Sequence, residues 1–130
     1  MGSGRRGPIV HWLTLLLILL AAPPAVAEPV PAGPGSPDRS TLREGYRRYQ
    51  GVCGHCHGPD GVGSTFAESL IAPVPARERF LAAVRDGVST SRGEMRGFAE
   101  DPNVAPYLDA IYAYLVERAA GRLGRGRPPG

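Results

Sequence analysis

The sequence predicts a small all-α domain of three to four helices. Three segments, near residues 40–57, 76–86 and 104–119, carry apolar residues at helical spacing. The stretches between them are rich in glycine, proline and other turn residues, which favour loops. A Cys-x-x-Cys-His motif at residues 53–57 ends the first segment and predicts a bound cofactor, around which the helices pack.

The first helix is expected to begin near Ser40. Thr41 to Glu44 fits a capping box, in which a threonine and a glutamate three residues later satisfy free amides of the first turn. The apolar positions that follow run at helical spacing into the motif and are Leu42, Gly45 or Tyr46, Tyr49 and Val52.

Two further helices are expected. The second runs from Ala76 to Asp86, and Gly87 follows it where a helix end often needs a left-handed residue. Its apolar stripe consists of Phe80, Leu81, Ala83 and Val84. The last runs from Val104 to Ala119, with Asn103 as its candidate cap. Its apolar face consists of Leu108, Ile111, Tyr114 and Leu115, whereas residues 88–102 show no sustained period.

Cys53, Cys56 and His57 have the spacing of an attachment site for a c-type haem. Two thiols three positions apart can each form a thioether with one haem vinyl group, and the adjacent imidazole can then ligate the iron. We therefore expect one covalently bound haem c. Because a domain of this size buries little apolar area, a large planar group at its centre would supply much of the core.

Two other uses of the cysteines fit less well. A redox disulfide of the thioredoxin kind expects a βαβ context and needs no histidine after the second cysteine. A structural zinc site needs four ligands, and the two cysteines and two histidines here all lie in one five-residue turn, with no second ligand pair elsewhere.

The flanking segments indicate secretion. Residues 1–27 have the layout of a cleaved signal peptide, with Arg5 and Arg6, an apolar run from about Leu13 to Ala22, and a small-residue site that predicts cleavage before Glu28. The run is shorter than the ~20 residues of a spanning helix, which disfavours a retained membrane anchor. Residues 28–39 are expected to form a flexible Pro/Gly-rich lead-in, residues 40–119 the folded domain, and residues 120–130 a solvated, flexible tail rich in arginine, glycine and proline. Haem c is attached outside the cytoplasm, so the expected location is the periplasm.

The charge balance disfavours two classes of partner. The chain has 15 Lys plus Arg and 12 Asp plus Glu, a formal charge of +3, and two of the arginines lie in the signal. The mature charge is then roughly +1, or roughly −1 with two haem propionates, which is too small to indicate binding to nucleic acid or to a membrane surface.

His57 would take one axial position of the iron, and elimination assigns the other to Met95. Met95 is the only methionine beyond the signal, and the one other histidine there, His55, sits inside the attachment turn. A thioether favours ferrous iron and fills the position where oxygen or peroxide would bind. The ligand pair therefore predicts an electron-transfer protein and not an enzyme, with no catalytic residues.

With these ligands the chain resembles a class I cytochrome c from Leu42 to Arg118. In that family a glycine, and an aromatic residue four positions later, on the first helix pack against an aromatic-leucine pair on the last helix; Gly45 and Tyr49 match the first pattern, and residues 111–115 match the second. A glycine lets two helices approach closely and an aromatic ring fills the crossing. The resemblance implies the class I cytochrome c fold, with the helices packed around the haem.

A narrower resemblance is to the small periplasmic cytochromes c that accept electrons from pyrroloquinoline quinone (PQQ) alcohol dehydrogenases. It is carried by residues 56–66, 95–104, 107–115 and 124–128. It implies a soluble monohaem carrier whose donor is such a dehydrogenase and whose acceptor is another cytochrome or a terminal oxidase. The alternatives are a general periplasmic carrier without a dedicated donor, a haem enzyme or gas sensor with a labile sixth ligand, and a docking module that uses the arginines between Arg118 and Arg127.

One feature of the class is missing. Many class I cytochromes have a proline about nine to twelve residues after the haem histidine, and the carbonyl of that proline accepts a hydrogen bond from the imidazole. In this chain the corresponding window is Phe66 to Ser69, which contains no proline. Any backbone carbonyl can serve, so the orientation of His57 can survive, but the sequence does not name the partner.

Overall fold

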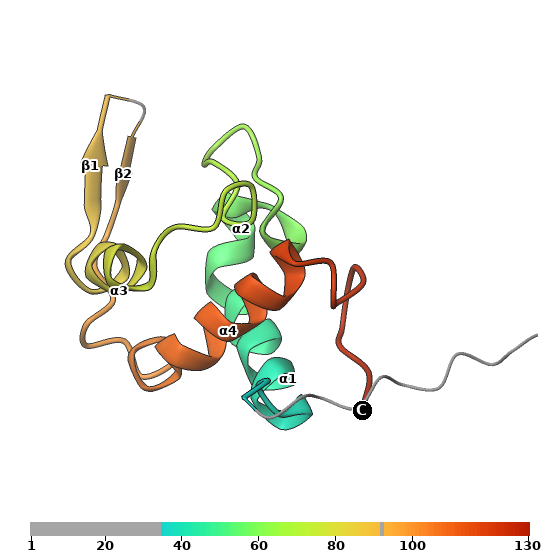
Figure 1. Ribbon diagram of the computed structural model, residues 1–130. Helices are drawn as coiled ribbons and strands as arrows, with labels where there is room; N and C mark the ends of the chain where they lie inside the picture. Colours follow the sequence, from blue (N-terminus) through green and yellow to red (C-terminus); the bar gives the residue numbers. More distant parts are fainter. Residues whose placement is uncertain (1–34, 92) are drawn as a thin grey trace, which may run out of the picture. The chain divides into compact units, whose positions relative to one another are not determined.

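The first and last helices of the domain cross at its centre (Figure 1). The computed structural model describes residues 35–91 and 93–130, so the expected signal peptide and the part of the expected lead-in before residue 35 lie outside the described residues. The elements, in chain order, are α1 (Arg39–Arg48), the π-helical turn η1 (Tyr49–Cys53), α2 (Gly54–His57), the 3-10 turn η2 (Pro59–Gly61), α3 (Arg77–Asp86), β1 (Val88–Thr90), β2 (Gly93–Met95), the 3-10 turn η3 (Ala105–Tyr107) and α4 (Leu108–Ala119). Across the described residues, no helix is long and apolar enough to cross a membrane.

Helix α1 starts earlier than the capping-box pattern predicts. Asp38 is the cap, and its carboxylate accepts a hydrogen bond from the Thr41 backbone N–H at 2.8 Å. Glu44, expected to close the box, instead pairs with Arg47 and Arg48 at 2.7 Å. An aspartate outside the expected start thus satisfies the free amides, which leaves Glu44 available for ion pairs along the helix.

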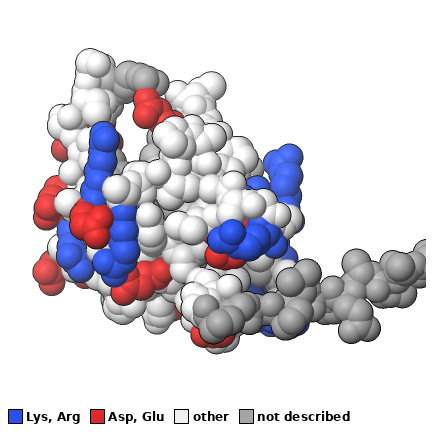
Figure 2. Space-filling model, in the orientation of Figure 1, with Lys and Arg blue, Asp and Glu red and all other residues white. Residues whose placement is uncertain are grey.

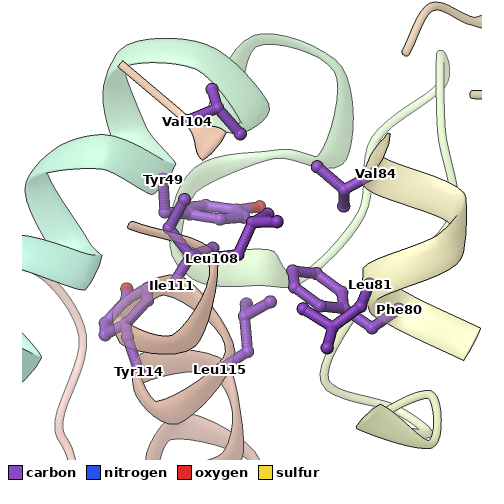
Figure 3. Packing of buried hydrophobic residues seen from close by; sticks show 9 residues of the cluster. All are labelled: Tyr49, Phe80, Leu81, Val84, Val104, Leu108, Ile111, Tyr114 and Leu115. Carbon is purple, nitrogen blue, oxygen red and sulfur yellow. The ribbon is translucent and has the colours of Figure 1, made fainter. Parts of the chain in front are cut away.

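The crossing of α1 and α4 follows the glycine–aromatic pattern. A Cβ atom on Gly45 would lie 2.0 Å from the Ala110 carbonyl oxygen, so only glycine allows this approach. Tyr49 and Tyr114 are fully buried, with ring centroids 5.7 Å apart, and Figure 3 shows Tyr49, Ile111 and Tyr114 next to one another on one side of the core cluster. The predicted packing of the first and last helices is confirmed.

Helix α3 confirms the second predicted helix. Phe80, Leu81 and Val84 are buried, and the Phe80 ring lies 5.2 Å from that of Tyr112 on α4. Gly87 ends the helix with φ +84°, a left-handed conformation that glycine adopts without strain.

Helix α4 begins later than the apolar pattern predicts. The regular helix starts at Leu108, and the 3-10 turn η3, which contains Pro106, precedes it. Val104, the expected first residue, is fully buried ahead of this turn. The predicted apolar face is confirmed, since all four of its residues are buried: Leu108, Ile111, Tyr114 and Leu115.

A short antiparallel hairpin occupies part of the stretch that showed no period. Strand β1 pairs with β2, with Val88 opposite Met95 and Thr90 opposite Gly93. Strands of three residues with exposed or half-buried side chains produce no alternating pattern, which is why the sequence did not predict them. The fold remains all-α in its core.

The end of the chain packs on the domain. Arg122 forms an ion pair with Glu117 at 2.6 Å, Leu123 packs against the core, and Pro128 is buried. The structure therefore differs at these residues from the solvated tail that the composition predicted.

Candidate functional site

Cys53, Cys56 and His57 lie on one continuous helical course. The π-helical turn η1 ends at Cys53 and α2 continues from Gly54, whose backbone N–H donates to the Tyr49 carbonyl. Both cysteines are free thiols, Cys53 half-buried and Cys56 exposed. A single helical turn thus presents two thiols and an imidazole together, as attachment and ligation of one haem require.

The His57 imidazole is held by a backbone carbonyl. Its Nδ1 lies 2.8 Å from the carbonyl oxygen of Glu68, eleven residues further along the chain. Because a carbonyl can only accept, Nδ1 carries the proton and donates it, which leaves Nε2 with a free lone pair for iron. Glu68 lies inside the window where many class I cytochromes have their proline, so a different residue type supplies the same hydrogen-bond acceptor. These donor atoms fit a c-type haem.

Two glycines bring Glu68 back to His57. Gly58 has φ +74°, and a Cβ on it would lie 2.2 Å from the Gly63 carbonyl oxygen. The Gly63 N–H donates to the His57 carbonyl at 2.7 Å. The chain therefore reverses directly after the histidine, and only glycine at residue 58 allows the reversal.

A buried tyrosine also holds the residues next to His57. The Tyr49 hydroxyl donates to the carbonyl of Gly58 at 2.8 Å and lies 3.3 Å from that of His57. Burial raises the pKa of Tyr49, so its proton stays on the oxygen and remains available for these carbonyls. The attachment turn is thus tied directly to the α1–α4 core.

Met95 comes from a separate part of the chain, the last residue of β2, and its side chain is half-buried. Figure 1 draws the hairpin and α2 as separate elements. The backbone of Met95 packs closely on the end of α3, because a Cβ on Gly87 would lie 2.7 Å from the Met95 carbonyl oxygen and one on Gly97 would lie 2.5 Å from that of Arg85. The position of Met95 is therefore fixed through its backbone, and its role as iron ligand stays a prediction.

The environment of Cys53 disfavours a redox disulfide. Burial, with a smaller contribution from Cys56, raises the pKa of the free Cys53 thiol to about 11. Reactive thiols of the thioredoxin kind have lowered pKa values, because only the thiolate attacks a disulfide.

Two residues of the site carried no recognisable signal in the sequence. Glu68 acts through its backbone carbonyl, for which no side-chain pattern exists. Asp60 is 3% exposed and accepts hydrogen bonds from Tyr114 and Gly126, residues 54 and 66 positions away. The sequence assigned Asp60 to a loop rich in turn residues, and only the fold brings its partners to it.

Comparisons with known proteins agree with the site. A family model described as "Cytochrome C oxidase, cbb3-type, subunit III" matches residues 40–115. The chain is similar to cytochrome c-553I of Paracoccus denitrificans, with 41% identity over 112 residues that cover 78% of this chain and 49% of that protein. It is also similar to the solved structure of the c-type cytochrome XoxG from Methylobacterium extorquens AM1, with 40% identity and a TM-score of 0.63 over 68% of this chain and 57% of that one. The chain thus spans about half the length of these relatives.

The family match covers the helices that build the attachment turn, and both relatives named here are cytochromes. The cofactor is haem c, and Cys53 and Cys56 are the residues that fit its covalent attachment. The chain therefore belongs to the c-type cytochromes, which bind haem c covalently.

Proposed function

We propose that the protein is a soluble periplasmic one-electron carrier with His57 and Met95 as axial iron ligands. The observation that carries this proposal is the Nδ1 hydrogen bond from His57 to Glu68, which leaves Nε2 free for the iron. When bound, the haem supplies one-electron chemistry by alternating between Fe(III) and Fe(II). The chain contributes a fixed imidazole, two attachment thiols and a tightly turned loop, none of which needs to move when an electron enters or leaves.

The proposed role of Met95 rests on its place in the chain and in the fold. It is the only methionine beyond residue 1, and close backbone packing on α3 fixes its strand. A thioether ligand raises the reduction potential relative to a second histidine, which suits a protein that accepts electrons.

The proposed donor is a PQQ alcohol dehydrogenase. The support is the resemblance of residues 56–66, 95–104, 107–115 and 124–128 to the cytochromes that such enzymes reduce. Oxidation of an alcohol to an aldehyde releases two electrons, so one turnover of the donor would reduce two molecules of this protein, one electron each.

One face of the protein suits such docking. Figure 2 shows charged side chains along the left, right and lower parts of this face, while its uppermost part, over the hairpin and the loop after α2, is mostly uncharged, apart from one acidic group beside the hairpin. Phe66, in that loop, is 80% exposed and Val62 is 45% exposed. An uncharged contact of this kind predicts a donor reaction that depends weakly on salt.

Stopped-flow mixing of the oxidised protein with the reduced dehydrogenase tests the donor. A dedicated donor gives fast haem reduction that saturates with dehydrogenase concentration, and Phe66→Ser slows it without changing the reduction potential. Arg47→Ser is the control, since Arg47 is an exposed residue of α1, outside the hairpin and the loop after α2. Slow, unsaturable reduction would instead identify a general periplasmic carrier.

The proposed acceptor is another cytochrome or a terminal oxidase. The description of the matching family model names an oxidase subunit, which supports an oxidase as the destination of the electron and makes direct membership of an oxidase complex a second candidate. A freely diffusing carrier restores oxygen consumption when added to membranes depleted of it by washing, whereas an oxidase subunit remains with the membranes through the wash.

A haem enzyme or gas sensor needs an open or labile sixth position. Met95 at that position removes the site at which oxygen, peroxide or carbon monoxide would bind. The ligation state of the iron therefore separates this alternative from the carrier.

A further inference from the structure

A buried carboxylate lies three residues after the haem histidine. Asp60 is 3% exposed and has φ +59°, a left-handed conformation that aspartate tolerates better than most residues. It lies on the 3-10 turn η2, between the attachment turn and the loop that returns to Glu68. A buried carboxylate requires hydrogen-bond donors, and the fold supplies them from three distant parts of the chain.

The donors join three elements at one side chain. The Tyr114 hydroxyl of α4 donates to Asp60 at 3.0 Å, and the Gly126 backbone N–H reaches both carboxylate oxygens at 3.1 Å. Gln50, on η1 just before the first attachment cysteine, donates at 3.3 Å, and the Arg125 guanidinium lies at 3.7 Å. Asp60 therefore links the attachment turn to α4 and to the end of the chain.

The arginines of the C-terminal segment serve the same contact. Arg118 donates to the Leu123 carbonyl at 2.8 Å, and Arg122 pairs with Glu117. Leu123 packs against the core. These contacts fold the segment back and deliver Gly126 to Asp60. Three of the arginines considered for partner docking, Arg118, Arg122 and Arg125, are thus engaged within the molecule.

We propose that Asp60 is a positioning residue that fastens residues 122–128 to the haem-attachment turn and, through its negative charge, lowers the reduction potential of the haem. A negative charge near the iron favours Fe(III), which carries one more positive charge than Fe(II), and burial strengthens the effect. The hydrogen bonds from Tyr114 and Gly126 offset part of that charge. The hydrogen bond and the charge of Asp60 also contribute to the raised pKa of Tyr114, after the larger effect of burial. The proposal depends on the haem of this family and not on the identity of the donor.

The first test compares Asp60→Asn with Asp109→Asn in the holoprotein. Asparagine keeps the shape of the side chain and tolerates the left-handed backbone, so this substitution removes mainly the charge. Asp109 is the matched control, because its side chain is 78% exposed on α4. Spectroelectrochemistry is expected to show an upward shift of the reduction potential in Asp60→Asn that clearly exceeds the shift in Asp109→Asn. Equal shifts would overturn the proposal.

The second test uses Tyr114→Phe, which removes one hydrogen bond and leaves the carboxylate charged. With less of its charge offset, Asp60 should now shift the potential downward, opposite in sign to Asp60→Asn. Loosening of the packing alone would move both variants in the same direction, and that result would contradict the proposal. Amide exchange at Gly126, measured in parallel, should become faster in Asp60→Asn, and unchanged exchange there would contradict the fastening role.

If Asp60→Asn yields no holoprotein, Tyr114→Phe and Arg125→Gln carry the test. Arg125 has a side chain that is 75% exposed, so its replacement leaves the core intact while removing a positive charge beside Asp60. Both variants should lower the potential, with Arg127→Gln as the control for loss of a nearby arginine. A potential unchanged in both would refute the proposal.

Discussion

The two proposed iron ligands lie in regions of very different construction. His57 ends a helical course that begins at Asp38, and its ring and backbone are held by Glu68 and Tyr49. Met95 ends a strand of three residues whose side chains are exposed or half-buried. His57 and Met95 are both half-buried, but the histidine side, residues 38–68, is tied to the buried core through Tyr49, whereas the methionine side, the hairpin of residues 88–95, depends on backbone packing against one helix. Local stability follows buried contacts, so the methionine side should open first.

Replacing His57 gives the largest expected effect. His57→Ala removes the axial imidazole beside the attachment cysteines, and we expect nearly complete loss of the native haem spectrum. His55→Ala is the matched control, since His55 is exposed in the same turn. Absorption spectra of purified protein check both variants, and a native spectrum in His57→Ala would show that another residue ligates the iron.

Replacing Met95 should leave the haem attached and change the ligation and reduction potential of its iron. Met95→Ala leaves both cysteines and His57 in place, so haem stays bound, while the reduction potential falls by an amount on the order of 0.2 V, within the ~0.8 V range that axial ligands span. Redox titration measures this fall. A potential that stays at the wild-type value would exclude Met95 as a ligand.

The histidine side can be weakened through the helix crossing. Gly45→Val places side-chain atoms against the Ala110 carbonyl, where even a Cβ would lie 2.0 Å away, and should lower the free energy of unfolding by about 3 kcal/mol. Gly51→Ala is the control, because a Cβ there meets nothing within 4 Å. Denaturant titration should show a lower midpoint in the first variant only, and equal midpoints would contradict the packing argument.

The methionine side can be weakened separately. Gly87→Ala forces alanine to φ +84° and brings its Cβ to 2.7 Å from the Met95 carbonyl, at a cost of roughly 2 kcal/mol. We expect the spectral signal of the sixth ligand to be lost at lower denaturant than in the wild type, ahead of global unfolding. Coincident loss of both signals would show that the two regions unfold together.

The smallest expected effect concerns the first turn of α1. Hydrogen bonds from Ser40 and from Thr41 lower the pKa of Asp38 from 3.8 to about 2. The contribution of this carboxylate to stability is therefore complete above about pH 4 and is lost as the pH falls towards 2. Asp38→Asn keeps the cap but does not titrate, so its stability should fall less across this window. Parallel loss of stability in both proteins would argue against the role of Asp38.

The sequence predicted those parts of the fold that depend on local chemistry. The faces of α3 and α4 followed from apolar spacing, and the contact of Gly45 with the last helix followed from the resemblance to class I cytochromes. The hairpin was missed because three-residue strands leave no periodic pattern. The packed C-terminal segment was missed because arginine, glycine and proline are typical of solvated tails, while its anchors lie far away in the sequence.

The site divides in the same way. The attachment cysteines and His57 form a local motif, so the sequence named them. The acceptor for the His57 ring is the carbonyl of Glu68, and every residue has such a carbonyl, so only the path of the chain after Gly58 identifies it. The role of Asp60 could not be predicted from the sequence, because its hydrogen-bond partners, such as Tyr114, are brought within reach only by the fold.

The absorption spectrum of the ferric and ferrous holoprotein, recorded with and without carbon monoxide, tests the central claim most directly. A His57/Met95 carrier gives a low-spin, six-coordinate spectrum in both oxidation states, and the ferrous form does not take up carbon monoxide. A high-spin spectrum, or ready binding of carbon monoxide by the ferrous protein, would contradict the account.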